Sequence, residues 1–149
     1  MKVVHVSITP LAGSPIQIVK ALRKYTHIEA NLVVFDSQAY GHRIFEGDID
    51  WLSEKEKALD IFKKADIFHF HHYFDLTNNC FGIDFSRYKK ICIRQFHSTP
   101  LTMAEGNENI AREIINSNIP QLVIAQYPER YFPNARVVPN IIPIFEEIY

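Results

Sequence analysis

The chain has 149 residues, of which 47% are hydrophobic and 22% are charged. These values are typical of one globular domain with its own core. Its 16 basic residues nearly balance its 17 acidic residues, so the charge does not favour a nucleic-acid partner.

The first elements form a strand–helix–strand unit. Residues 2–8 are rich in β-branched residues and predict a strand, which is followed by a loop containing Gly13. Ser14 is a favourable N-cap, and we expect it to begin a helix whose apolar residues recur at helical spacing as far as Tyr25. Residues 31–37 then predict a second strand.

The middle of the chain continues this alternation. Residues 38–51 predict a loop with a short element, and the capping-box pattern of residues 53–56 predicts a helix that ends at Lys64. Residues 66–71 predict a third strand. Residues 73–88 are rich in aromatic side chains, most of which we expect in the core.

The last third of the chain completes an alternating pattern. Residues 91–96 predict a fourth strand, a loop begins at Pro100, and a helical pattern follows around residues 107–117. Residues 122–125 and 136–138 predict two further strands. Strands that alternate with helices indicate an α/β fold, with a Rossmann-like parallel sheet, helices on both faces and one domain spanning the whole chain.

The cysteines and the apolar segments indicate a compartment. Cys80 and Cys92 have no CxxC spacing, and we expect Cys92 to be a buried free thiol in a reducing environment. The N-terminus lacks a signal-peptide pattern, and no apolar run is long enough to span a bilayer. We therefore expect a cytoplasmic protein, with contact to a membrane surface left open.

Histidines gather at the ends of two predicted strands. His69, His71 and His72 end the third strand, and His97 follows the fourth. The carboxyl ends of parallel strands share one edge of a sheet, and ligands bind there. We interpret His97 as catalytic and His71 and His72 as substrate-binding residues near the rim. His69 lies within the strand, so we expect it to be structural.

Two other features have open interpretations. The helix that follows Gly13 and Ser14 can hold an anion through its first N–H groups, so both residues are candidates for substrate binding. Arg94 is unusual inside a buried strand. It either pairs with a carboxylate at the sheet edge or points into a cleft, and the sequence does not decide between these positions.

The order of these motifs resembles the N-terminal domain of GT-B glycosyltransferases, in particular family GT4. The motifs are the loop of residues 10–14, Ala-Asp-Ile-Phe-His-Phe-His at 65–71, Phe-His-Ser at 96–98 and Val-Val-Pro-Asn at 137–140. The resemblance implies that the loop faces the donor phosphates and that His97 lies close to the reacting sugar. It also adds Ser98 and Asn140 to the substrate-binding candidates, with Asn140 at the crossing to a second domain.

The resemblance implies one half of a two-domain enzyme. Such an enzyme transfers a hexose from a nucleotide sugar to a hydroxyl group of a glycan, lipid or other acceptor, and we expect no cofactor and no metal. We expect the donor-binding domain to be absent from this chain, so that activity requires a donor-binding partner domain or subunit. Two alternatives stay open: a binding module without chemistry, and a metal-dependent enzyme that uses His71, His72 and His97.

Overall fold

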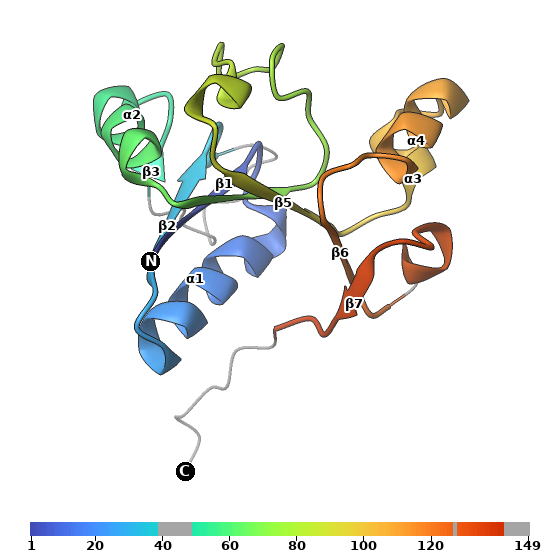
Figure 1. Cartoon of the computed structure of the whole chain (residues 1–149), viewed down its shortest axis with the longest axis horizontal. Helices are drawn as coiled ribbons and strands as arrows, with labels where there is room; N and C mark the ends of the chain where they lie inside the picture. The colour runs from blue at the N-terminus through green and yellow to red at the C-terminus, as the bar shows by residue number, and fades with distance from the viewer. Residues whose placement is uncertain (39–48, 127, 142–149) are drawn as a thin grey trace.

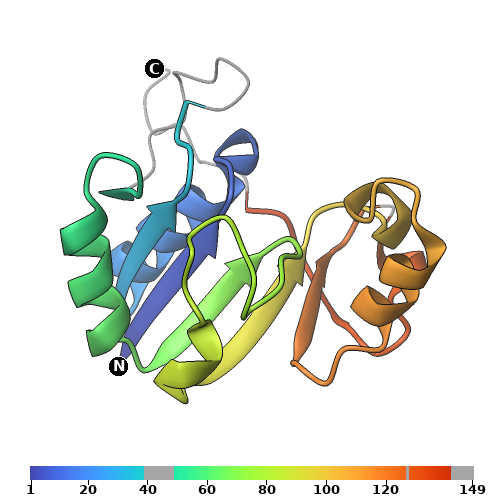
Figure 2. The same ribbon diagram turned by 90° about the horizontal axis from the view of Figure 1, so that it is seen from above.

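A seven-stranded sheet runs through the computed structural model, which describes residues 1–38, 49–126 and 128–141 (Figures 1 and 2). Every strand pairing is parallel, in the order β3-β2-β1-β4-β5-β6-β7. The strands are β1 (Lys2–Ser7), β2 (Glu29–Val34), β3 (Ile49–Asp50), β4 (Ile67–His71), β5 (Ile91–Phe96), β6 (Gln121–Ile124) and β7 (Arg136–Val138). The predicted α/β class with a Rossmann-like parallel sheet is confirmed.

Helices cover both faces of this sheet, as the sequence predicts (Figure 1). The helices are α1 (Ser14–Tyr25), α2 (Lys55–Lys64), α3 (Pro100–Met103) and α4 (Glu108–Ile115), with single 3-10 turns η1 (Leu11–Gly13), η3 (Phe85–Tyr88) and η4 (Pro128–Tyr131). Helix α1 packs its Ile16 and Val19 against β2 on one face, called here the α1 face. Helices α2, α3 and α4 cover the opposite face, the α2 face.

The register of the central strands decides which side chains lie on each face. Val4 pairs with Phe68, and His5 pairs with His69 in the neighbouring strand β4. Paired residues of a parallel ladder point to the same side, and successive residues alternate. The α2 face of β1 and β4 is therefore apolar, while their α1 face carries histidines.

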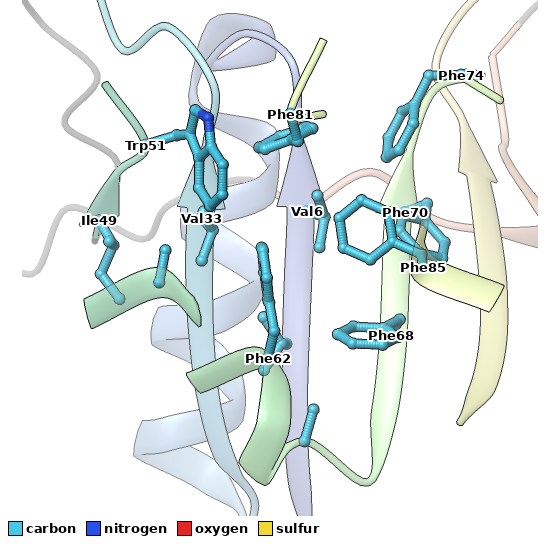
Figure 3. Packing of buried hydrophobic residues seen from close by; sticks show 13 residues of the cluster. Val6, Val33, Ile49, Trp51, Phe62, Phe68, Phe70, Phe74, Phe81 and Phe85 are labelled. Atoms are coloured by element: carbon cyan, nitrogen blue, oxygen red, sulfur yellow. The ribbon is translucent and has the colours of Figure 1, made fainter. Parts of the chain in front are cut away.

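An aromatic cluster fills the α2 face (Figure 3). The ring of Phe85 lies 5.2 Å from that of Phe62 and 5.4 Å from that of Phe68, both in edge-to-face contacts. Such contacts add about 0.5–1.5 kcal/mol each to the burial of the rings. The expectation that the aromatic residues of the 73–88 segment lie mostly in the core is confirmed, because Phe74, Phe81 and Phe85 are buried.

Both predicted helix caps are wrong. Gly13 precedes α1 in the left-handed conformation (φ 81°), and Ser14 is already the first helical residue. At the second helix the Ser53 hydroxyl donates to Asp50 instead of capping, and Glu54 is the residue before α2. In both places the turn before the helix overrides the preference of serine for the cap position.

Two further elements differ from the sequence prediction. Strand β2 begins at Glu29 and ends at Val34, so it lies earlier than the predicted segment 31–37. The loop predicted after Pro100 contains the single-turn helix α3, whose N-cap Thr99 accepts a hydrogen bond from the N–H of Thr102. Most of the predicted loop at 38–51 lies outside the described residues.

Arg94 is buried on the α2 face, and its position matches neither alternative that the sequence left open. Its guanidinium group donates to the carbonyl of Phe74 at 3.3 Å and to the hydroxyl of Ser117 at 3.2 Å. It also lies over the ring of Tyr73, 4.8 Å from the centroid. Arg94 therefore connects the segment after β4 to the loop before β6 through hydrogen bonds.

Two sequence expectations concern thiols and membrane spans. Cys80 and Cys92 are free, and Cys92 is half-buried where the sequence predicts a buried thiol. Among the described helices, none has both the length and the apolar character that crossing a membrane requires.

The aromatic cluster generates a stability prediction. Phe62 is 0% exposed and contacts rings from two other segments, so Phe62→Ala should lower the free energy of unfolding by about 3–5 kcal/mol. Tyr25→Ala removes another aromatic ring from a helix, but Tyr25 is 68% exposed, and the change should stay within about 0.5 kcal/mol. Urea denaturation followed by circular dichroism measures both. Equal losses in the two variants would contradict this account of the core.

Candidate functional site

Two adjoining cavities lie at the carboxyl edge of the sheet. The first, of about 270 Å³, is called here the His97 cavity, and its lining is Leu11, Ala12, Gly13, Ser14, Gln17, His97, Ile124, Asn140 and Ile141. The second, of about 280 Å³, is called the His72 cavity, and its lining is Ser7, Ile8, Thr9, Leu11, His71, His72, Tyr73 and Met103. Leu11 borders both, so the η1 loop separates them. This edge is where parallel α/β sheets bind ligands.

The sheet brings most of the predicted site residues together. Gly13, Ser14, His97 and Asn140, which the sequence spreads over 128 positions, all border the His97 cavity. His71 and His72 border the His72 cavity. Ser98 is half-buried and lines neither cavity. The roles assigned to these residues stay predictions.

The loop between the cavities has a left-handed backbone. Leu11, Ala12 and Gly13 have φ values of 48°, 51° and 81°, and the N–H of Gly13 donates to the carbonyl of Pro10 at 2.9 Å. Glycine adopts this conformation readily, whereas it costs Leu11 and Ala12 roughly 1–2 kcal/mol each. Helix α1 then starts without a side-chain cap, which leaves its first N–H groups suited to an anion in the His97 cavity.

Three histidines, from β1, from β4 and from the position directly after β5, form a hydrogen-bonded row, called here the histidine row. The ring nitrogens Nδ1 of His5 and Nε2 of His71 are 2.9 Å apart. On the other side of the same ring, Nδ1 of His71 lies 3.0 Å from Nε2 of His97. His71 is 0% exposed although it borders the His72 cavity, so it links the other two rings from a buried position. Both its nitrogens are occupied within the protein.

Two more histidines stack on this row. The ring of His69 lies 4.7 Å from that of His71 at an interplanar angle of 16°. The ring of His72 lies 5.6 Å from that of His97 and is almost parallel to it, at 7°. His69 is buried and also interacts with the side chain of Gln95, which agrees with the structural role expected for it. His97 is thus held by one hydrogen bond and one stacked ring.

Burial keeps these histidines neutral. It lowers the pKa of His69 and of His72 to about 4, and together with the neighbouring histidines it lowers the pKa of His97 to about 3. Burial also holds the pKa of His5 and of His71 well below the ordinary value. A neutral imidazole offers one N–H donor and one lone pair, so at neutral pH the site works through hydrogen bonds and not through positive charge.

The geometry favours hydrogen bonding over metal chelation. Ring nitrogens of His5, His69 and His71 lie within 4.8 Å of one another, and three imidazoles can hold zinc. However, His5 and His71 approach to 2.9 Å, whereas two nitrogens on a tetrahedral zinc ion lie roughly 3.3 Å apart. The nearly parallel rings of His69 and His71 also direct their lone pairs side by side.

Asp75 does not face a metal site formed by His71, His72 and His97, although it is the acidic residue nearest to His72 in the sequence. Its Oδ1 instead accepts hydrogen bonds from the backbone N–H groups of Thr77 and Asn78, within its own turn.

Sequence reasoning missed part of the site. His5 lies within β1 and has no motif around it that marks it. Its signal is positional: it occupies the same face as His69 once β1 and β4 are placed side by side. Gln17, Tyr73 and Met103 also line the cavities, and each lies in the segment that follows a strand predicted from the sequence.

Comparison of the chain with protein-family models, with curated proteins and with solved structures finds no match. The function is therefore argued from the order of the motifs, the fold and the geometry of this edge.

The buried histidines generate a prediction about pH. Their folded-state pKa values lie below the ordinary value near 6.5, so the unfolded chain binds more protons and stability falls as the pH drops from 7 towards the folded values. Each such histidine should cost about 2 kcal/mol between pH 7 and pH 5. Together they are comparable with the roughly 5–15 kcal/mol that stabilises a typical domain, so we expect unfolding near pH 5.

Urea denaturation at pH 7, 6 and 5 measures this loss. In His69→Gln one of the five titrating groups is removed, and the loss between pH 7 and pH 5 should shrink by about 2 kcal/mol. A free energy of unfolding that is the same at pH 7 and pH 5 would show that the histidines are not buried as neutral groups.

Proposed function

We propose that this chain is the acceptor-side domain of a GT-B glycosyltransferase. It works with a donor-binding partner domain or subunit to transfer a hexose from a nucleotide sugar to a hydroxyl acceptor. The observation that carries the proposal is the meeting of His97, the η1 loop and Asn140 in one cavity at the carboxyl edge of the sheet. The resemblance of the motifs implies the same grouping.

His97 is the catalytic residue of this proposal. Its neutral ring is fixed by His71 and His72 and borders the cavity, so it can form a hydrogen bond with a sugar hydroxyl without first losing a proton. A fixed polar group of this kind stabilises charge that develops near the reacting carbon. Because its pKa is lowered, His97 is not an imidazolium ion at neutral pH, and so it is a poor general acid there.

The start of α1 supports a donor phosphate in the same cavity. Gly13 and Ser14 place the uncapped first turn of this 12-residue helix at the cavity wall. The unpaired N–H groups and the dipole of a helix N-terminus favour a negatively charged group. A nucleotide sugar carries such a group next to the bond that is broken.

The His72 cavity suits the acceptor. Tyr73, Met103 and Ile8 give it apolar walls, while His72 and Thr9 add polar atoms. Apolar walls with a few polar groups are typical of sites for small organic molecules, and a sugar presents both an apolar ring face and hydroxyl groups. The shared Leu11 puts this cavity directly beside the proposed position of the donor.

A second candidate, a binding module without chemistry, is favoured by one observation. The lining of the two cavities contains no Asp, Glu, Lys or Arg among the described residues. Carboxylates that contact the donor must therefore come from another domain. If none binds, the fold keeps a ligand site without the groups needed for transfer.

An assay of sugar transfer separates the two candidates. The chain is mixed with nucleotide sugars and hydroxyl acceptors, alone and together with candidate donor-binding domains. We expect transfer only in the mixture, because the chain supplies one wall of the cleft. If the chain binds an acceptor by itself and associates with no donor-binding domain, the binding module is the correct function.

A substitution tests the role of His97 in the reconstituted enzyme. His97→Ala should lower kcat by about 100-fold, the usual cost of losing one fixed hydrogen-bond donor at a reacting centre. Its effect on the free energy of unfolding should be within about 2 kcal/mol. His27→Ala is the control, because His27 is exposed beyond the C-terminus of α1, at the other end of that helix. Parallel losses of turnover and stability would make His97 a structural residue.

A further inference from the structure

The histidine row has a direction, because each of its rings is neutral. His71 uses both ring nitrogens, Nε2 towards His5 and Nδ1 towards His97. A neutral imidazole has one N–H and one lone pair, so His71 must donate at one nitrogen and accept at the other. The two hydrogen bonds therefore run the same way along the row, either towards His97 or towards His5.

The buried end of the row decides between the two directions. Nε2 of His5 is buried and has no hydrogen-bond partner among the described residues. If the bonds ran towards His5, its Nδ1 would accept, and its proton would lie on Nε2 as a buried N–H without an acceptor. If they run towards His97, His5 donates through Nδ1 and leaves only a bare lone pair. Orphaned buried N–H groups are rarer than unsatisfied acceptors, which favours the second direction.

The same direction fixes the other end. Nε2 of His97 accepts from His71, so the proton of His97 lies on Nδ1. This nitrogen forms no hydrogen bond with any described residue, and the ring borders the His97 cavity. His72, stacked on the same ring, keeps the ring plane in place without competing for either nitrogen.

We propose that His71 is a positioning residue, oriented by His5, that holds His97 in the Nδ1–H form, so that His97 presents an N–H donor to the cavity. The group that it recognises must then be an acceptor oxygen, such as a hydroxyl, carbonyl or phosphate oxygen. His97 cannot act as a base through Nδ1 in this form. The effect on turnover rests on the proposed function, whereas the form of the ring does not.

Nuclear magnetic resonance of the full chain tests the form of the ring without any substrate. Protonated and bare ring nitrogens of histidine resonate far apart in long-range ¹H–¹⁵N spectra, and His97→Gln identifies the signals of His97 by their loss. At pH 7.5 we expect a protonated Nδ1 and a bare Nε2 for His97. A histidine in water favours the opposite form, so a protonated Nε2 in the wild-type chain would overturn the proposal.

Two substitutions at position 71 test the coupling. His71→Phe removes the donor to His97, whose ring should then change to the Nε2–H form. His71→Asn places an amide N–H near the position of Nδ1 and should keep the Nδ1–H form. His69→Phe is the control, because His69 stacks on the row without a hydrogen bond in it. A His97 ring that stays in the Nδ1–H form in folded His71→Phe would overturn the role of His71.

The outcomes separate this proposal from the proposed function. In a reconstituted enzyme, His71→Phe should lower kcat about tenfold with little change in KM, and His71→Asn should restore most of it. If the spectra show the expected forms but no donor-binding domain gives transfer, the proposed function is wrong. The proposal that His71 holds His97 in the Nδ1–H form is then still supported. If His71→Phe does not fold, the wild-type spectrum alone decides.

Discussion

The parallel register of β1 with β4 is the constraint on which the rest of the structure depends. It sets His5 beside His69 and Val4 beside Phe68, and thereby divides the sheet into an aromatic face and a histidine face. A slip of one residue would exchange these faces, placing imidazoles under α2 and phenyl rings under α1. The pairing of β4 with β5 adds His97 to the same side, since His71 pairs with Gln95 and His97 lies two residues after Gln95.

The two faces contribute to the molecule in opposite ways. The aromatic cluster on the α2 face provides the large apolar burial that a domain of this size needs. The α1 face instead buries imidazoles, and two of their nitrogens, Nε2 of His5 and Nε2 of His69, lack partners among the described residues. Buried polar atoms of this kind cost stability. These histidines lower stability and lie beside two cavities, which favours a functional role for them.

The sequence predicts the architecture because the spacing of apolar residues and the composition can be read within each segment alone. Alternation of Phe and His in β4 gives the strand, its two faces and the edge at which it ends. The depth of a residue is not local: His71 is the last residue of its predicted strand and is still fully buried, because its ring lies between those of His5 and His97. His5 has no mark in its own segment, and only the register with β4 assigns it to the row. The predictions of caps at Ser14 and Ser53 are wrong because the preceding turns, and not the serines, determine where the helices start.

The order of the strands has a consequence for how the chain folds. The strand made first, β1, lies near the centre of the sheet, and its partner β4 is more than 60 residues away in sequence. Because every pairing among the described strands is parallel, no two of these strands are joined by a tight hairpin, and closing the sheet requires long connections. Chains dominated by such distant contacts fold slowly. During synthesis, β1 therefore cannot pair with β4 until β4 has been made. The histidine row is complete only when residue 97 has left the ribosome.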